Sequence, residues 1–326
     1  MTTPRAGIGR ITAALVAIAA MLPYLTIKVL WLTGSSLGVT DPNLMGTSTM
    51  LGMNALTFGM DAVALVLALA FTMRWGMRLP AWLVLLPLWV GTGLLSVVMM
   101  TAPLGLGLEG MGVFANGGPI EPWVYLAVYA GFFGQGAGLL TAFVLYARDR
   151  WPALFSTPIG YGPAPATKPF QLVVGWGALL VVALLGGTRI VWALGGGLSA
   201  VAAAQGVLKG GLAIAAGAAL LVVVRGSGRR PFWQPLAAGW LGSGAMFGWG
   251  MYALIVMIVG GPLGVEIEAA AGLVELFTTL TGLVIGMCGG FVLVERLTVG
   301  DVQPPQHPLE GEDRDGDRQA AHHGHR

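Results

Sequence analysis

Eight long apolar stretches constrain this chain more than any other feature of its sequence. A transmembrane α-helix needs roughly 20 apolar residues to cross a hydrocarbon core about 30 Å thick. Stretches of this kind lie at residues 11–33, 53–73, 81–102, 123–147, 170–194, 204–224, 234–260 and 270–294. The whole chain is 56% hydrophobic and 10% charged, whereas soluble domains carry about 25% charged residues. The sequence therefore predicts an all-α, polytopic membrane protein with eight transmembrane helices.

Basic residues predict how these helices are oriented. In multi-pass proteins, lysines and arginines concentrate in the cytoplasmic connections. Of the 17 such residues in this chain, 14 fall on one side of the predicted spans: Arg5, Arg10, Arg74, Arg78, Arg148, Arg150, Lys168, Arg225, Arg229, Arg230, Arg296, Arg314, Arg318 and Arg326. We therefore expect both termini to be cytoplasmic and the protein to lie in a bacterial inner (cytoplasmic) membrane.

A repeated tryptophan motif indicates an internal duplication. The pattern Pro-x-Trp-x6-Trp-aliphatic-Gly-hydroxyl-Gly begins at Pro80 and again at Pro231, 151 residues later. Lys28 likewise has a counterpart in Arg189. Since each predicted repeat holds four helices, an even number, the two repeats are expected to cross the membrane in the same direction. The first span also has a counterpart in mid-chain, so we expect it to be retained and not cleaved as a signal peptide.

The predicted domain organisation consists of two halves, a linker and a tail. Residues 1–148 form the first four-helix membrane half, and residues 170–299 form the second. Between them, residues 149–169 contain five prolines and are expected to form a semi-rigid cytoplasmic linker. Residues 300–326 are acidic, contain the histidines and have almost no apolar residue, so a disordered cytoplasmic tail is expected there.

Charged residues inside the predicted spans are the candidates for function, because charge is costly in hydrocarbon and marks interior or water-filled sites. Lys28 and Asp61 are expected at nearly the same depth. We hypothesise an outward-facing polar cavity between the halves, where Lys28 and Arg189 bind a small anionic ligand while Asp61 and Glu275 balance charge or titrate. The candidate substrate-binding residues are Lys28, Arg189, Asp61, Glu275, Lys209, and the amides Asn54 and Gln205. The alternative is that the bases only extend to the outer interface and the acids form structural ion pairs.

The sequence lacks the usual signals of catalysis and cofactor binding. All four histidines, His307, His322, His323 and His325, lie in the predicted tail, so none is placed to ligate haem or a metal inside the membrane. The tail histidines could bind a metal adventitiously, but a solvated terminus is the preferred interpretation. Gly105, Gly107 and Gly110 spell G-x-G-x-x-G in a predicted external loop with no preceding strand, which does not predict a dinucleotide site. We expect no cofactor, no metal site and no enzyme.

Three functional interpretations follow. A permease-like transporter predicts that the buried charges converge on one cavity. A scaffold or sensory partner, binding a second copy or another membrane protein, predicts instead that these charges pair locally. An enzyme acting on lipid through Asp61 or Glu275 is the weakest reading.

In composition and layout over residues 1–300, the chain resembles uncharacterised multi-pass membrane proteins of actinobacteria, a resemblance that implies no site and no activity. The expected partners are the lipid bilayer and either the anionic ligand or a protein; no nucleic acid is expected.

Overall fold

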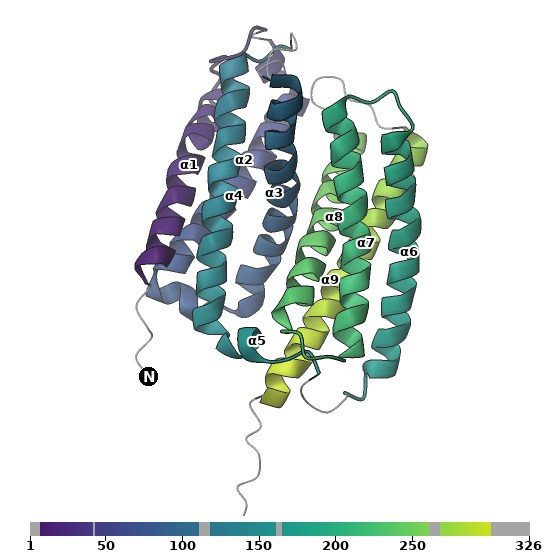
Figure 1. Ribbon diagram of the computed structural model, residues 1–326. Coiled ribbons are helices and arrows are strands. Elements are labelled where there is room, and N and C mark those ends of the chain that lie inside the picture. The colour runs from purple at the N-terminus through teal and green to yellow at the C-terminus, as the bar shows by residue number, and fades with distance from the viewer. Residues whose placement is uncertain (1–6, 42, 111–117, 161–164, 261–267, 301–326) are drawn as a thin grey trace, which may run out of the picture.

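The protein is a bundle of long helices (Figure 1). The computed structural model describes residues 7–41, 43–110, 118–160, 165–260 and 268–300, with only the backbone described for Glu109 and residues 297–300. Its elements are α1 (Ile8–Leu32), η1 (Leu44–Gly46), α2 (Ser48–Thr72), η2 (Arg74–Arg78), α3 (Ala81–Glu109), α4 (Pro122–Arg150), α5 (Pro152–Ser156), α6 (Lys168–Leu194), α7 (Ala200–Arg225), α8 (Trp233–Val259) and α9 (Ala269–Gly300). Residues 301–326, which hold nearly all of the predicted tail and every histidine, lie outside the described residues.

Eight of these helices are long and apolar enough to cross a membrane, which confirms the predicted multi-pass, all-helical class. Several helix ends differ from the prediction, and those of α2 and α3 have clear consequences. α2 begins five residues early because the Thr47 hydroxyl caps it, accepting a hydrogen bond from the Met50 N–H at 3.3 Å. α3 continues to Glu109, so Gly105 and Gly107 lie in its last turns and not in the loop that we expected. Among the described residues that precede the G-x-G-x-x-G pattern at Gly105, the chain forms no strand.

The helices form two groups that follow the order of the chain. In Figure 1, α1 to α4 lie together on one side and α6 to α9 on the other. We call the end of the bundle where α1 begins and where α5 lies the lower end, and the opposite end the upper end. α1 packs mainly against α4 and α2, whereas α6 packs mainly against α7, and α8 against α9 and α7. The two halves therefore share an order of helices but differ in their internal packing.

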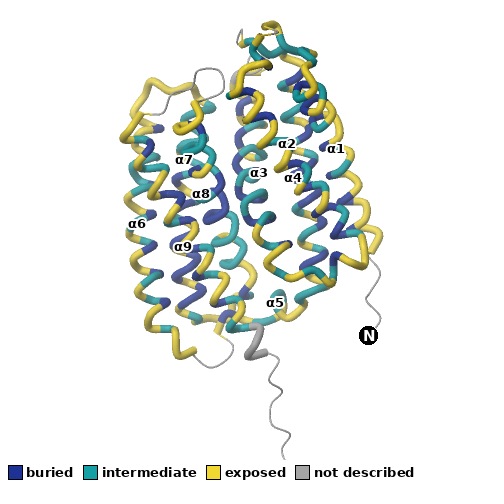
Figure 2. The backbone as a smooth tube through the Cα atoms, turned by 180° about the vertical axis from the view of Figure 1, so that it is seen from behind, coloured by how far each residue is buried: buried dark blue, intermediate teal, exposed yellow. Residues whose placement is uncertain are grey.

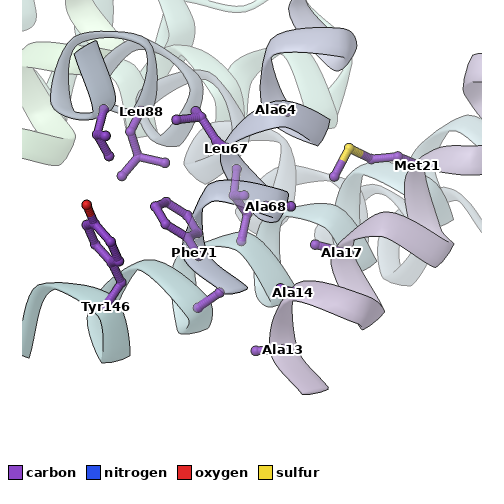
Figure 3. Packing of buried hydrophobic residues seen from close by; sticks show 13 residues of the cluster. Ala13, Ala14, Ala17, Met21, Ala64, Leu67, Ala68, Phe71, Leu88 and Tyr146 are labelled. Carbon is purple, nitrogen blue, oxygen red and sulfur yellow. The ribbon is translucent and has the colours of Figure 1, made fainter. Parts of the chain in front are cut away.

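The outer surface of the bundle is apolar, as expected of a chain surrounded by lipid. Figure 2 shows exposed positions along the outer sides of the helices. Large apolar side chains are exposed there, such as Val173, Leu184 and Met287. The interior is apolar as well and combines small, aliphatic and aromatic side chains: in the first half, Ala14, Leu88 and Phe71 are fully buried (Figure 3). Small residues allow the close helix contacts on which packing within a membrane depends.

The halves meet where α3 crosses α8. The two backbones approach so closely that a β-carbon added to Gly93 would lie 2.1 Å from the carbonyl carbon of Gly244. A β-carbon on Gly244 would in turn lie 2.3 Å from the carbonyl oxygen of Trp89. Glycine is therefore required on both sides of this crossing.

Two hydrogen bonds lie across the same crossing and mirror each other. The indole Nε1 of Trp89 donates to the Ser243 hydroxyl at 2.9 Å. The indole Nε1 of Trp240 donates to the Thr92 hydroxyl at 3.0 Å. Trp89 and Trp240 occupy the same position of the repeated motif, and so do Thr92 and Ser243. Each motif thus supplies the donor for the other motif's hydroxyl.

The described part of the segment between the halves, up to residue 160, packs against the lower end of the second half. Part of the predicted linker is the short helix α5, and residues 157–160 then pair with the connection between α7 and α8. The Ile159 N–H donates to the Arg230 carbonyl at 2.9 Å. Arg296 at the lower end of α9 donates to the Ile159 carbonyl at 2.7 Å. These contacts hold the connection in place.

Candidate functional site

The structure divides all of the predicted site residues except Gln205 between two clusters, one inside each half. The Lys28 cluster consists of Tyr24 and Lys28 from α1, Asn54 and Asp61 from α2, and Gln135 from α4. The Arg189 cluster consists of Arg189 from α6, Lys209 from α7, Trp249 from α8 and Glu275 from α9. Each cluster draws on several helices of a single half, which follows from how tightly those helices pack.

Small residues bring the helices of the Lys28 cluster together. A β-carbon on Gly134 of α4 would lie 2.7 Å from the β-carbon of Ala20, and one on Gly138 would lie 2.6 Å from the carbonyl oxygen of Ala13. Between these glycines, Gln135 is buried and faces α2, where its amide Nε2 donates to Asp61 Oδ1 at 3.2 Å. The glycine spacing of α4 therefore positions the amide that contacts the buried acid.

Lys28 is held by one hydrogen bond and two aromatic rings. Its ammonium donates to Asn54 Oδ1 at 2.7 Å and lies 4.8 Å from the ring centre of Tyr24 and 5.3 Å from that of Trp31. Such cation–π contacts contribute more when the cation is removed from water, and Lys28 is only 5% exposed. The side chain is therefore buried and partnered, and does not extend freely to the interface.

Asp61 lies deeper than expected. Lys28 lies four residues before the upper end of α1 at Leu32, about 6 Å along the helix axis. Asp61 lies 13 residues after the upper end of α2 at Ser48, about 20 Å along that axis. Asp61 is further from its helix end than the sequence suggested because α2 begins at Ser48, capped by Thr47, and not near residue 53. The carboxyl group of Asp61 is thus near the middle of its helix, 5% exposed.

Close helix crossings also build the Arg189 cluster. A β-carbon on Gly186 of α6 would lie 2.7 Å from the carbonyl oxygen of Gly210 in α7. Within one turn of that crossing are Arg189 and Lys209, whose charges are near enough to interact. On the other side, a β-carbon on Gly250 of α8 would lie 3.0 Å from the Glu275 carbonyl. Tight packing on both sides therefore places two bases and one acid together.

The three charges of this cluster are unequally paired. Arg189 and Glu275 form an ion pair at 2.9 Å, with 16% of each side chain exposed. Lys209 has its ammonium 4.0 Å from the ring centre of Trp249. The indole Nε1 of Trp249 is buried and has no hydrogen-bond acceptor. With all three groups ionised, the cluster carries one surplus positive charge.

A small cavity lies among these side chains. It is lined by Arg189, Lys209, Ala245, Met246, Trp249, Gly250, Glu275 and Thr278. Its free space is about that needed by one water molecule. Both bases, the acid and the unpaired indole therefore meet around one hollow.

This arrangement differs from the single cavity between halves that we expected. Lys28, Asn54 and Asp61 do not line the hollow at Arg189, and α1 and α6 lie on opposite outer sides of the bundle in Figure 1. The position of a charged residue along a helix does not show towards which neighbouring helix its side chain points. In this structure the charged side chains point into the interior of their own half. Gln205 is half-buried one turn before Lys209, outside the cavity lining.

Sequence reasoning missed Trp249 and Tyr24 as members of the clusters. Tryptophan and tyrosine are common in membrane helices as anchors, so neither has a sequence signal that marks it as a cation partner.

Over the part of the chain that the structure describes, no three side chains of the metal-ligating types come together. Comparison with protein-family models, with curated proteins and with solved structures finds no match to this chain.

Proposed function

We propose that the protein is a permease-like transporter of small anions, with its anion site in the Arg189 cluster. One observation carries this proposal: two basic side chains and one acidic side chain line a cavity together with Trp249, whose buried indole N–H has no acceptor. A buried surplus charge is costly unless a counter-ion balances it. An anion in the hollow would balance the charge and accept the hydrogen bond that Trp249 lacks.

The size of the cavity sets the class of substrate. A space that holds about one water molecule is close to the size of a monatomic anion such as chloride. A larger metabolite would need the side chains around it to move. Lys28, which was expected to bind the ligand, has no part in this site because Asn54 and two aromatic rings already hold it.

We also propose that the halves are duplicates that cross the membrane in the same direction, with the lower end facing the cytoplasm of a bacterial inner membrane. The reciprocal indole–hydroxyl bonds at the α3–α8 crossing support the duplication, because equivalent motif positions exchange donors there. The positive-inside rule supports the orientation, since Arg74, Arg78, Arg225 and Arg230 lie in lower connections or at lower helix ends.

A test compares two lysine variants of the purified protein, Lys209→Met and Lys28→Met. Chloride, bromide, nitrate and formate are each titrated as sodium salts, with gluconate keeping the ionic strength constant, and thermal unfolding is followed. A ligand present at about 100 times its dissociation constant stabilises the folded state by about 2.7 kcal/mol. Lys209→Met keeps the Arg189–Glu275 ion pair but removes the surplus charge, so we expect affinity to fall at least about tenfold.

Lys28→Met is the matched control, because it removes a buried lysine from the other half. The anion should stabilise this variant as it does the wild type. An anion effect that Lys209→Met leaves unchanged would overturn the proposed site. Uptake of the same anion by liposomes containing the protein then tests transport, and binding without uptake would contradict the permease function alone.

A scaffold or assembly partner is the second candidate. The observation in its favour is local pairing: Arg189 pairs with Glu275, and Lys28 with Asn54, each inside one half. On this reading, none of the anions stabilises the protein, and cross-linking in native membranes captures the chain with itself or with one other membrane protein at defined positions.

A further inference from the structure

Asp61 stands apart from the other acidic side chains that the structure describes inside the bundle. Its Oδ1 accepts one hydrogen bond, from Gln135, at 3.2 Å. Its Oδ2 is buried and accepts none. Glu275, by contrast, is joined to Arg189 at 2.9 Å. The first half thus contains a buried carboxyl group with an unsatisfied oxygen about 20 Å from the upper end of its helix.

The groups around Asp61 do not neutralise it by direct contact. From α1, Lys28 and Tyr24 are near enough to act on it electrostatically. Lys28 nevertheless forms no ion pair with it, since the ion pairs of the described residues are Arg10 with Asp149 and Arg189 with Glu275. From α4 comes the neutral Gln135, and α3 has no ionisable residue between Ala81 and Leu108.

The position of Lys28 explains why it forms no ion pair with Asp61. Asn54, two turns before Asp61 on α2, holds the ammonium at 2.7 Å, and the rings of Tyr24 and Trp31 flank it. These contacts hold the ammonium at Asn54 and not at Asp61. An isolated carboxylate in an apolar interior is far less stable than a neutral acid, so the simplest compensation is a proton on the unsatisfied oxygen.

We propose that Asp61 is a reversible proton-binding site inside the membrane half formed by α1 to α4. Its Oδ2 binds the proton in the neutral state, and Oδ1 keeps the hydrogen bond from Gln135. On release of the proton, the charge of Lys28 stabilises the carboxylate. This site is separate from the anion site of the second half and does not depend on it.

Infrared difference spectroscopy on the protein in liposomes tests the site without any reagent having to reach it. A step between mildly acidic and mildly alkaline buffer should produce a carbonyl-stretch band of a protonated carboxyl group. The band should be lost in Asp61→Asn, which keeps the size of the side chain. It should remain in Asp149→Asn, the matched control at the lower end, and its titration midpoint should move to higher pH in Lys28→Met.

Isotope labelling keeps the test decisive if Asp61→Asn folds poorly. Wild-type protein grown with aspartate carrying ¹³C in its side-chain carboxyl should show the band shifted to lower frequency, while glutamate labelled in the same way should leave it in place. A band that follows the glutamate label, or that survives in folded Asp61→Asn, overturns the proposal. So does the absence of any protonated-carboxyl band over the whole pH range.

Discussion

At the scale of single residues, the two clusters use the same kinds of side chain in different ways. Asp61 and Lys28 are both buried yet not joined, whereas Glu275 is joined to Arg189 with Lys209 nearby. Removing one partner of a buried ion pair is strongly destabilising, because the remaining charge is left uncompensated. The cost therefore depends on what other charge is within reach.

Glu275→Gln should destabilise the protein more than Arg189→Gln. Without Glu275, two buried cations face each other, and we expect a loss of about 3–5 kcal/mol in unfolding free energy. Without Arg189, Lys209 still balances the acid, so the loss should be smaller. Unfolding in mixed micelles measures both, and adding Lys209→Met to Glu275→Gln should restore part of the stability. Equal losses in the two single variants would contradict this account of the cluster.

Sequence reasoning identified the buried charges but not their partners. The cost of charge in hydrocarbon is enough to single out Lys28, Asp61, Arg189 and Glu275. Partner choice depends on how each helix is rotated, and these helices have apolar residues on nearly every side. Their sequences therefore contain little information about which face turns inward.

At the scale of helices, the α3–α8 crossing is the most sensitive contact in the molecule. The sequence predicted both helices and the motif that they share, but not that these two helices pack against each other. Such a contact joins residues far apart in the chain and leaves no periodic signal. The early start of α2 and the late end of α3 escaped prediction because hydropathy does not mark helix caps.

Gly93→Ala should separate the halves locally and lower stability. Its β-carbon would lie 2.1 Å from the backbone of Gly244, and backbone cannot move aside without shifting a whole helix. We expect a cost of about 1–3 kcal/mol, measured by thermal unfolding. Gly91→Ala is the matched control on the same helix, because its β-carbon would meet nothing within 4 Å, and it should be neutral or slightly stabilising. Similar losses in both variants would mean that the crossing is not tightly packed in the membrane.

At the scale of the whole molecule, the eight helices and their order could be predicted from hydropathy, because the length of an apolar stretch is set by bilayer thickness. The different arrangements of buried charge in the two halves could not be predicted in this way. Although the repeated motif suggests equivalent halves, α1 packs mainly on α4 while α6 packs mainly on α7. Because the packing differs, the first half contains a buried acid without an ion pair, Asp61, and the second contains a base beyond its ion pair, Lys209.

Cysteine accessibility tests the proposed orientation of the halves. In a variant with Cys288→Ser, single cysteines replace Thr40 and Leu198 in upper connections, or Arg74 and Ser227 in lower ones. A maleimide that cannot cross membranes should label the first two positions in intact cells. The other two should react only after permeabilisation. Labelling of Thr40→Cys and Leu198→Cys from opposite sides would rule out halves that cross in the same direction.

The mirrored bonds of Trp89 with Ser243 and Trp240 with Thr92 have an evolutionary consequence. Each motif carries both the donor and the acceptor, so a single four-helix ancestor already held everything required to associate with an identical copy around a two-fold axis. On the proposed duplication, gene fusion then preserved an existing homodimer contact. Once both copies shared one polypeptide, each was free to acquire its own buried charges without disturbing the surface that joined them.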